Sequence, residues 1–325
     1  MDELFPPPPK LANYRATSRP VHDSDIAFLR ERLNDLGRFS AIHWIVSDEP
    51  PTPKLDIPCV EDLFLVEAYT NATDKVQWLR TNLTVSKEQI EEVAKLTTGQ
   101  RTNHLWALVR KNRLTASNFG LVLAAIRRKR FPPSLFKQIF ASYNLATKDA
   151  ILWGTSSEAV AREKYCSYGD AVVEETGVWL HESGVLGASP DGIIRRAATH
   201  NYCHQVAELT DILEGMRLKP EILEIKCPFS ARNMTISEAI GSIKDFYLEY
   251  QAHEGKQLYR LKENHKYYDQ VQGQLHIMNK SACDFVVWTT KDIAIVRILQ
   301  DSNWTPNIAE LKDFYFSKVV NLIHQ

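Results

Sequence analysis

Two short stretches of this chain carry the acids and the lysine that could perform chemistry together. The first, residues 187–194, places Asp191 in a Pro-Asp-Gly turn, where a side chain can reach past the edge of a sheet. The second, residues 221–228, alternates as a strand does, so that Glu224 and Lys226 point to one face. Two carboxylates and an ammonium could then meet. Such a group suits a partly hydrated Mg²⁺ and a lysine that orients or deprotonates an attacking water.

The Glu-x-Lys triplet is a weak signal when it is taken alone. It occurs by chance in a chain of average composition, and surface strands carry such pairs harmlessly. Its apolar surroundings raise its significance, because a buried Leu-Glu-Ile-Lys-Cys strand leaves a Glu and a Lys that need partners. The ordered pair of Pro-Asp and then Glu-x-Lys resembles the PD-(D/E)xK nuclease signature. That resemblance implies acids that hold Mg²⁺ and a lysine that assists water attack on a phosphodiester.

Two predicted helices could bring further polar groups to this place. A helix over residues 147–165 carries Glu158 amid small and apolar residues. A lone glutamate there is more often a surface residue, but a helix packed on the sheet would bring it to the metal from a third direction. The other helix, over residues 264–279, has a stripe that is usually packing and capping but could position a phosphate or a water beside a metal. Its members are Tyr267, Gln270, Val271 and Gln274.

Basic residues gather before and after a third predicted helix, which ends near Arg128. Arg110 and Arg113 lie beside the hydroxyl groups of Thr115 and Ser117 at its start, which is anion-binding chemistry. The basic run at residues 127–130 suits the C-terminal end of the helix dipole. The same run could also be a nuclear import signal or a contact to the DNA backbone.

Composition bounds the class of protein. The chain has 325 residues, is 44% hydrophobic and has a formal net charge of −1, which is ordinary globular composition. The near-zero charge argues against a uniformly basic nucleic-acid binder, although a local basic patch is allowed. The five cysteines lack metal-binding spacing, which favours reduced thiols in the cytosol or nucleus. No apolar run is long enough to span a bilayer, and the acidic, proline-rich N-terminus is not a secretory signal.

Periodicity and turn residues predict alternating helices and strands. Acids in the first turn mark a helix over residues 23–36, and a capping box marks another from Ser86 to about Leu96. The other expected elements are a strand over 41–46, helices near 60–69 and 307–323, hairpins over 172–188 and 285–298, and a loop with a short helix near 205–216. The aromatic residues of the last helix are expected in the core.

Five sequence blocks, in this order, are similar to those of YqaJ-type viral recombinase nucleases, which resemble phage lambda exonuclease. The resemblance covers about residues 95–300, and residues 1 to about 90 have no recognised counterpart. The blocks are Trp106 with Arg110 and residues 114–117, residues 154–158 with Ala161 and Tyr165, residues 189–192, residues 224–228, and residues 267–272.

The resemblance implies an α/β (α+β) fold with a PD-(D/E)xK restriction-endonuclease-like core, in which helices flank a central mixed β-sheet. Three regions are then expected. Residues 1–20 would be a flexible proline-rich arm, residues 21–95 an added, mainly helical region, and residues 96–325 the nuclease domain.

The resemblance also implies a two-metal exonuclease that depends on Mg²⁺, with Mn²⁺ as a substitute. It would degrade linear double-stranded DNA from 5′ to 3′ and leave 3′ overhangs for an annealing protein in recombination or repair. By motif position, Asp191 and Glu224 would hold the metals with the carbonyl of Ile225, and Glu158 would ligate or orient the second ion. The family includes toroidal trimers, so a homo-oligomer is a further expectation.

The remaining roles follow from motif position in the same way. Lys226 would orient the nucleophilic water, and Gln270 would lie beside the active site. Arg110, with Thr115 and Ser117, would grip the 5′-phosphate. Residue types alone support metal-assisted phosphodiester hydrolysis, whereas the polarity and the choice of DNA over RNA come from the resemblance. An endonuclease with the same core and a non-catalytic DNA-end-binding recombination module are the alternatives.

Overall fold

The structure is a computed structural model, and its described residues are 19–36, 41–46, 55–140, 149–168, 171–196, 219–253 and 256–323. Contacts divide the chain into two compact units, residues 1–54 and 55–325. Nearly all of the predicted N-terminal arm and the predicted helix near 205–216 lie outside the described residues. Within the described residues, no helix is long and apolar enough to cross a membrane.

The first unit contains helices α1 (Asp23–Asp35) and α2 (Ala41–Val46). The helix expected over residues 23–36 is confirmed, with Asp23 and Asp25 in its first turn. The strand expected over residues 41–46 is wrong, because this segment is α2. A strand needs a neighbour to pair with, and the described residues of this unit offer none, whereas a helix bonds its own backbone. Arg30 Nε donates to the last carbonyl of α2, on Val46, at 2.8 Å.

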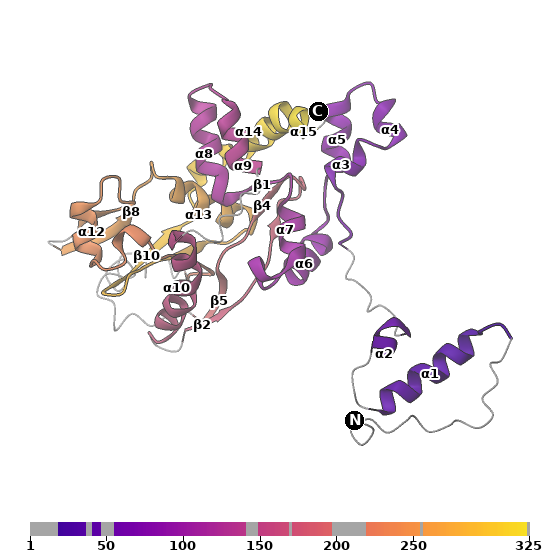
Figure 1. Cartoon of the computed structure of the whole chain (residues 1–325). Helices are drawn as coiled ribbons and strands as arrows, with labels where there is room; N and C mark the ends of the chain where they lie inside the picture. The colour runs from indigo at the N-terminus through magenta and orange to yellow at the C-terminus, as the bar shows by residue number, and fades with distance from the viewer. Residues whose placement is uncertain are drawn as a thin grey trace, which may run out of the picture. The chain divides into compact units, whose positions relative to one another are not determined.

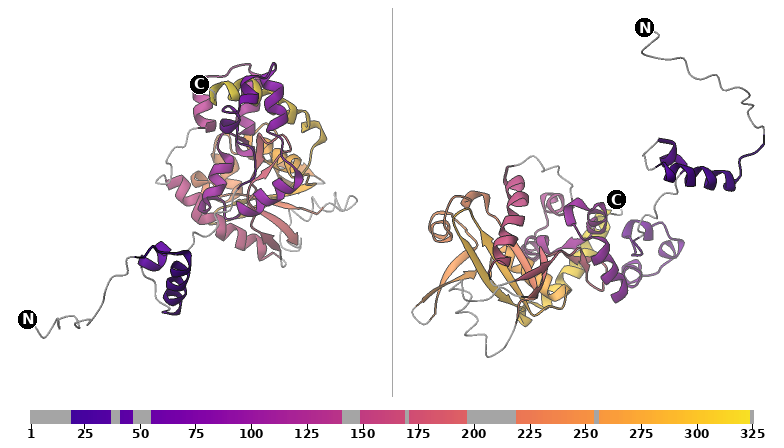
Figure 2. Two further views of the ribbon diagram at one scale, coloured as in Figure 1. Left: turned by 90° about the vertical axis from the view of Figure 1, so that its right-hand side faces the viewer. Right: turned by 90° about the horizontal axis from the view of Figure 1, so that it is seen from below.

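The second unit is built on a five-stranded mixed sheet of order β10-β9-β6-β5-β2. Figure 1 labels β10, β5 and β2 of this sheet, and Figure 2 shows the ribbon from two further sides. β6 and β9 are parallel, and the other neighbours are antiparallel. The expected α+β class with a central mixed sheet is therefore confirmed, as is the C-terminal hairpin. The strands are β2 (Val172–Glu174), β5 (Gly192–Arg196), β6 (Ile222–Lys226), β9 (Ala282–Trp288) and β10 (Ile293–Leu299).

A smaller sheet of order β1-β4-β3 and a two-stranded ribbon β7-β8 complete the strands of the described chain. The hairpin expected over residues 172–188 is only half correct, because β3 pairs with β4 while β2 joins the larger sheet. Between β2 and β3 the backbone bonds to the end of α6 and the residue after it in place of a neighbouring strand. Gly177 N donates to Ala94 O, and Val178 N donates to Thr97 Oγ1. These strands are β1 (Leu114–Thr115), β3 (Trp179–Leu180), β4 (Leu186–Ala188), β7 (Leu248–His253) and β8 (Lys256–Leu261).

Helices cover both faces of the central sheet. On one face, Leu223 and Ile225 pack in a cluster with Ala161 and Tyr165 of α10. On the other face, Ile222 packs in a cluster with residues of α12 and α13. The helices of this unit are α3 (Val60–Leu63), α4 (Glu67–Thr70), α5 (Lys75–Asn82), α6 (Lys87–Leu96), α7 (His104–Arg110), α8 (Ala116–Arg127), α9 (Pro133–Phe140), α10 (Asp149–Cys166), α12 (Ile236–Ser242), α13 (Lys266–Ile277), α14 (Pro306–Phe314) and α15 (Val320–Ile323).

Several local predictions are confirmed and one is split. α6 begins at Ser86 with the expected capping box. The helices expected near 147–165 and 264–279 are α10 and α13. The helix expected near 60–69 is two short helices, α3 and α4, because the chain turns at Phe64 to Val66. The C-terminal helix forms with a π-helical turn (Tyr315–Val319) between α14 and α15, and its aromatic residues are buried as expected.

Residues 55–95 pack as part of the second unit. Val85 N donates to Glu182 O at 2.9 Å, and Gly177 N reaches Ala94 O at 3.1 Å. The side chain of Arg80 bonds to Asp313 at 2.8 Å. The division by contacts therefore falls at residues 54 and 55 and differs from the predicted boundary at residues 95 and 96.

Candidate active site

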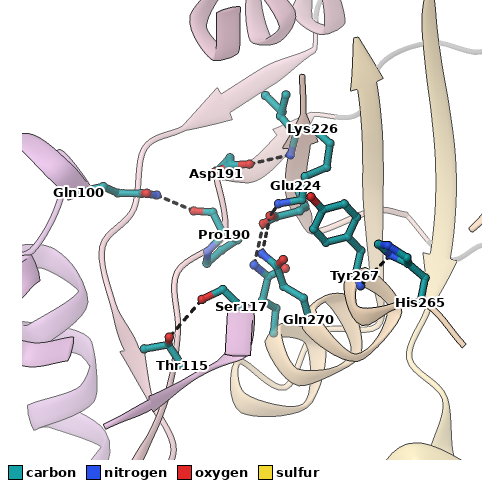
Figure 3. A network of polar contacts seen from close by, with 12 residues as sticks. Gln100, Thr115, Ser117, Pro190, Asp191, Glu224, Lys226, His265, Tyr267 and Gln270 are labelled. Carbon is teal, nitrogen blue, oxygen red and sulfur yellow. Dashed lines mark hydrogen bonds and ion pairs between the residues drawn. The ribbon is translucent and has the colours of Figure 1, made fainter. Parts of the chain in front are cut away.

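The pairing of β5 with β6 brings Asp191 to the strand that carries Glu224 and Lys226 (Figure 3). Asp191 lies in the bend directly before β5, where its backbone N–H donates to Leu223 O at 2.9 Å. Its carboxylate Oδ2 accepts the backbone N–H of Ile225 at 2.6 Å. The turn and the alternating strand, both read from the sequence, therefore meet as expected.

Glu224 is buried under helix α13. Its side chain is 3% exposed, and it points to the α13 face because it alternates with Leu223 and Ile225, which face α10. Gln270 Nε2 donates to one carboxylate oxygen at 2.6 Å, and Gln274 Nε2 donates to the other at 2.7 Å. Both oxygens of this buried acid are thus satisfied, which a buried charge requires.

Lys226 completes this network. Its ammonium pairs with Glu224 Oε1 and lies 4.7 Å from the centre of the Tyr267 ring. Burial lowers the pKa of Lys226, but the carboxylates of Glu224 and Asp191 outweigh burial and raise the pKa above its ordinary value. Lys226 is therefore a cation that donates hydrogen bonds at neutral pH.

Glu158 approaches from the other face of the sheet, on α10. It is half-buried and lines the same cleft as Asp191 and Glu224. Burial and then the charge of Glu224 raise the pKa of Glu158, while Arg101 and Arg162 oppose this shift. The condition set for Glu158 holds, because α10 packs on the sheet; its role as a metal ligand stays a prediction.

The donor set fits a hard divalent cation. Burial and then the charges of Glu224 and Glu158 raise the pKa of Asp191 well above its usual range, which is the mark of acids that crowd one another. Carboxylate oxygens are the ligands that Mg²⁺ prefers. Burial and then Glu158 and Asp191 raise the pKa of the neighbouring Cys227 to about 12, and a soft thiol is in any case not a ligand that Mg²⁺ prefers.

This site is not yet arranged as a set of ligands. Among the described residues, no three side chains of His, Cys, Asp or Glu are placed to hold a metal ion. Both carboxylate oxygens of Glu224 accept hydrogen bonds from protein donors. The residue types therefore fit a cation, because a carboxylate offers about four acceptor positions and Glu224 uses three of them, for Gln270, Gln274 and Lys226.

The acids open into a cleft of about 400 Å³. Arg110 lines this cleft with its guanidinium 4.1 Å from the ring centre of Trp106, whose Nε1 donates to Ser189 Oγ at 2.9 Å. Burial and then the charge of Arg101 lower the pKa of Arg110 to about 10. Other lining residues are Gln100, Arg101, Ser117, Thr155, Ile225, Lys266 and Gln270.

The two hydroxyl residues differ in position. Ser117, in the first turn of α8, lines the cleft and is exposed. Thr115 is buried and is not among the lining residues of this cleft. Its Oγ1 lies 3.2 Å from Ser117 Oγ, so Thr115 orients Ser117 from behind (Figure 3).

The structure corrects the predicted place of Arg113. Its guanidinium is buried, and it donates to the carbonyls of Gly184, Val109 and Pro58 at 2.7, 2.8 and 2.7 Å. It is not among the residues that line the cleft. Sequence spacing put it beside Arg110, but the loop after α7 turns its long side chain to the interior. Arg113 therefore holds backbone segments together.

Sequence reasoning missed two groups. Gln274 was seen only as part of a stripe, yet it binds Glu224 as Gln270 does; its spacing of four residues from Gln270 was the available signal. Arg101 lines the cleft, but no pattern in the sequence pointed to it.

Residues 105–284 match the YqaJ-like viral recombinase domain family. The chain belongs to this family. The match contains all of the acids described above, together with Lys226 and Arg110, and so confirms the resemblance read from the sequence blocks.

Relatives of this YqaJ-like chain include the alkaline nuclease of Autographa californica nuclear polyhedrosis virus, which is 22% identical over 228 residues, or 68% of this chain and 49% of the relative. The chain thus spans about half the length of that relative. Among solved structures, the alkaline exonuclease LHK-Exo of Laribacter hongkongensis is 20% identical, with 67% of this chain and 93% of that chain covered and a TM-score of 0.44. The shutoff and exonuclease protein of Kaposi's sarcoma-associated herpesvirus is 10% identical, with 81% and 80% covered and a TM-score of 0.37.

Proposed function

We propose that this chain is a Mg²⁺-dependent 5′-to-3′ exonuclease that hydrolyses linear double-stranded DNA and leaves 3′ overhangs for recombination or repair. The observation that carries this proposal is the convergence of Asp191, Glu224 and Lys226 at the end of two paired strands, with Glu158 in the same cleft. Membership of the YqaJ-like family supports the same function.

Asp191, Glu224 and Glu158, together with the carbonyl of Ile225, are the groups that would hold two divalent cations, Mg²⁺ or in its place Mn²⁺. Such ions, when bound, polarise the phosphate and lower the pKa of water. The protein residues supply orientation. Lys226 donates from its protonated ammonium to the water or to the phosphate oxygen that faces it.

Gln270 and Gln274 hold the carboxylate of Glu224 in a single orientation through one hydrogen bond to each oxygen. Because a misplaced catalytic group loses much of its effect, this double contact is a positioning device. Gln270 also lines the cleft that the scissile phosphate would enter.

The preference for ends comes from the other wall of the cleft. Arg110 presents a guanidinium that is stacked against Trp106, and Ser117 presents a hydroxyl at the start of α8. Guanidinium and hydroxyl donors at a helix start bind phosphate. A terminal 5′-phosphate held there would leave the first phosphodiester facing the acids, so ends would be cut before internal sites.

The test compares a linear duplex with a closed circular duplex of the same sequence, each with Mg²⁺ or with a chelator. We expect release of nucleotides from 5′ ends of the linear duplex with Mg²⁺, and intact circles. Circles cut at a rate comparable to that of linear DNA would favour the endonuclease alternative. DNA-end binding without any hydrolysis would favour the non-catalytic module.

Lys226→Ala tests the proposed chemistry. We expect hydrolysis to fall by at least about 100-fold, the usual size of a lost general acid–base or orienting group, while the affinity for duplex ends changes little. The control is Lys291→Ala, which removes an exposed lysine and should leave both quantities unchanged. Undiminished turnover by the Lys226 variant would remove Lys226 from the mechanism.

We also propose DNA ends as the macromolecular partner. Assembly into a trimer, action with a single-strand annealing protein and a nuclear or cytoplasmic location stay predictions from the sequence.

A further inference from the structure

Arg101 lines the same cleft as Arg110, although no role was predicted for it. It belongs to a short 3₁₀ turn, Gln100–Thr102, directly before α7. Its Nη1 donates to Thr155 Oγ1 of α10 at 3.0 Å. Thr155 lies three residues before Glu158 on the same helix, so this bond holds the guanidinium near Glu158. Arg101 therefore faces the cleft from the side of the acids.

The turn that carries Arg101 is fastened to the active site. Gln100 Nε2 donates to Pro190 O at 2.8 Å (Figure 3), and Pro190 directly precedes Asp191. Gly99 and Gln100 both have positive φ, 89° and 46°, which bends the chain sharply at this point. The bond between Gln100 and Pro190 therefore couples the position of this turn to the position of Asp191.

The same segment also carries Arg110. Asn103 caps α7 by accepting the backbone N–H of Leu105 at 3.0 Å. Its amide also donates to Leu96 O and Thr98 O at 2.8 and 2.9 Å. These bonds tie the start of α7 to the end of α6, and Asn103 N donates to Gln100 O at 2.9 Å, so the 3₁₀ turn with Arg101 is held directly before the helix that ends in Arg110.

Neither guanidinium forms an ion pair with a carboxylate among the described residues, although the charge of Arg101 acts on Glu158. Arg101 bonds to a hydroxyl and Arg110 stacks on an indole, and no ion pair joins either of them to an acid in the described chain. Two like charges that face one cleft repel each other. An anion with two negative charges between them would remove this repulsion and bind to both planar groups.

We infer that Arg101 and Arg110 form a two-arginine clamp for the terminal 5′-phosphate and that Arg101 makes the clamp selective for a phosphate monoester. This inference rests on the proposed function. A terminal phosphate monoester carries a charge of about −1.5 to −2 at neutral pH, whereas each internal phosphodiester carries one negative charge. A single arginine suits either group, and the second arginine favours the monoester.

The experiment measures binding rather than turnover. Short duplexes that differ only in a 5′-phosphate or a 5′-hydroxyl are titrated with the full chain in chelator, and fluorescence anisotropy gives the ratio of the two dissociation constants. The variants are Arg101→Ala, Arg101→Lys and Arg110→Ala. The control is Arg195→Ala, which removes an exposed arginine of β5 that pairs with Glu174 of β2.

We expect the wild-type chain to prefer the phosphorylated duplex and Arg101→Ala to lose about tenfold of that preference, the effect of one charge-assisted hydrogen bond. Arg101→Lys should recover part of it, since a lysine keeps the charge but not the planar fork. Arg195→Ala should behave as wild type. Melting curves check that each variant is folded.

Two outcomes would overturn the clamp, and they are separate from failure of the proposed function. An Arg101→Ala chain with the full wild-type preference would exclude Arg101 from phosphate binding. A wild-type chain without any preference would exclude the clamp even if hydrolysis is observed. Conversely, a preference that depends on Arg101 would support the clamp even in a chain that cleaves no DNA.

Discussion

The phenol of Tyr165 donates to Asp284 Oδ2 at 2.8 Å in the buried space between α10 and the central sheet. Asp284 also binds the guanidinium of Arg297 through two contacts of 3.0 and 3.2 Å, and both charged groups are almost fully buried. Tyr165 lies on the same helix as Glu158. This bond therefore fixes the helix that brings Glu158 to the other acids.

Tyr165→Phe removes this bond and leaves the ion pair of Asp284 and Arg297 in place. We expect the free energy of unfolding to fall by about 1 kcal/mol, the net value of one hydrogen bond, as measured by urea denaturation. Hydrolysis should fall several-fold, because the helix of Glu158 is held less firmly. Tyr250→Phe, which removes an exposed hydrogen bond to Ser237, should change neither quantity. Equal results for the two variants would mean that Tyr165 does not position α10.

Gln274→Met tests the support of Glu224 from α13. The side chain of Gln274 is 1% exposed, and it donates to a buried carboxylate at 2.7 Å. We expect a loss of about 1.5–3 kcal/mol in the free energy of unfolding, the range for hydrogen bonds to charged groups. Gln138→Met, on the exposed side of α9, should stay within about 0.5 kcal/mol of wild type. A stable Gln274 variant would show that Glu224 needs only its other donors.

Gly120→Ala tests the crossing of α8 and α13. A Cβ on Gly120 would lie 2.6 Å from Lys266 Cα, so the helices would have to separate. We expect a loss of about 1–3 kcal/mol, the usual cost of overpacking, and slower hydrolysis because Ser117 and Gln270 would move apart. Gly241→Ala in α12 meets no atom within 4 Å and should stabilise its helix by about 0.5–1 kcal/mol. Denaturation curves of the two variants in parallel measure both effects.

The pH dependence of stability should show the contribution of His265. Burial and then Lys266 and Lys262 lower the pKa of His265 from 6.5 to about 4, while its Nδ1 accepts the Tyr267 N–H at the start of α13. The unfolded chain therefore binds more protons between pH 6.5 and 4, so stability falls as the pH falls through this window. His265→Asn keeps an acceptor and should flatten that slope.

The control for this prediction is His104→Asn, which replaces an exposed histidine and should keep the wild-type slope. The free energy of unfolding is measured at several pH values between 4 and 7. A His265→Asn profile parallel to wild type would mean that the neutral cap contributes nothing to folding.

Local pattern was sufficient to predict strand β6 and the turn that carries Asp191. Alternation put Glu224 and Lys226 on one face, and a Pro-Asp-Gly bend put Asp191 at the end of its neighbour; each depends on residues next to one another in the chain. The C-terminal hairpin and the capped start of α6 were predictable for the same reason.

Tertiary packing decided the rest. Arg110 and Arg113 have the same side-chain chemistry and lie three residues apart. Because the chain turns between them, Arg110 lines the cleft and Arg113 is buried in the interior. The cleft position of Arg101 depends on a bond between Gln100 and Pro190, which are distant in sequence. Residues 41–46 have strand-forming side chains but no strand beside them in the described unit.

The contacts of Glu224 predict how the protein responds when divalent cations are removed. Its negative charge is offset from within by two amides and one ammonium, so the polypeptide can reach its native arrangement before any ion arrives. Under the proposed function, dialysis against a chelator should therefore abolish hydrolysis while the protein stays folded, and added magnesium should restore hydrolysis without a refolding step.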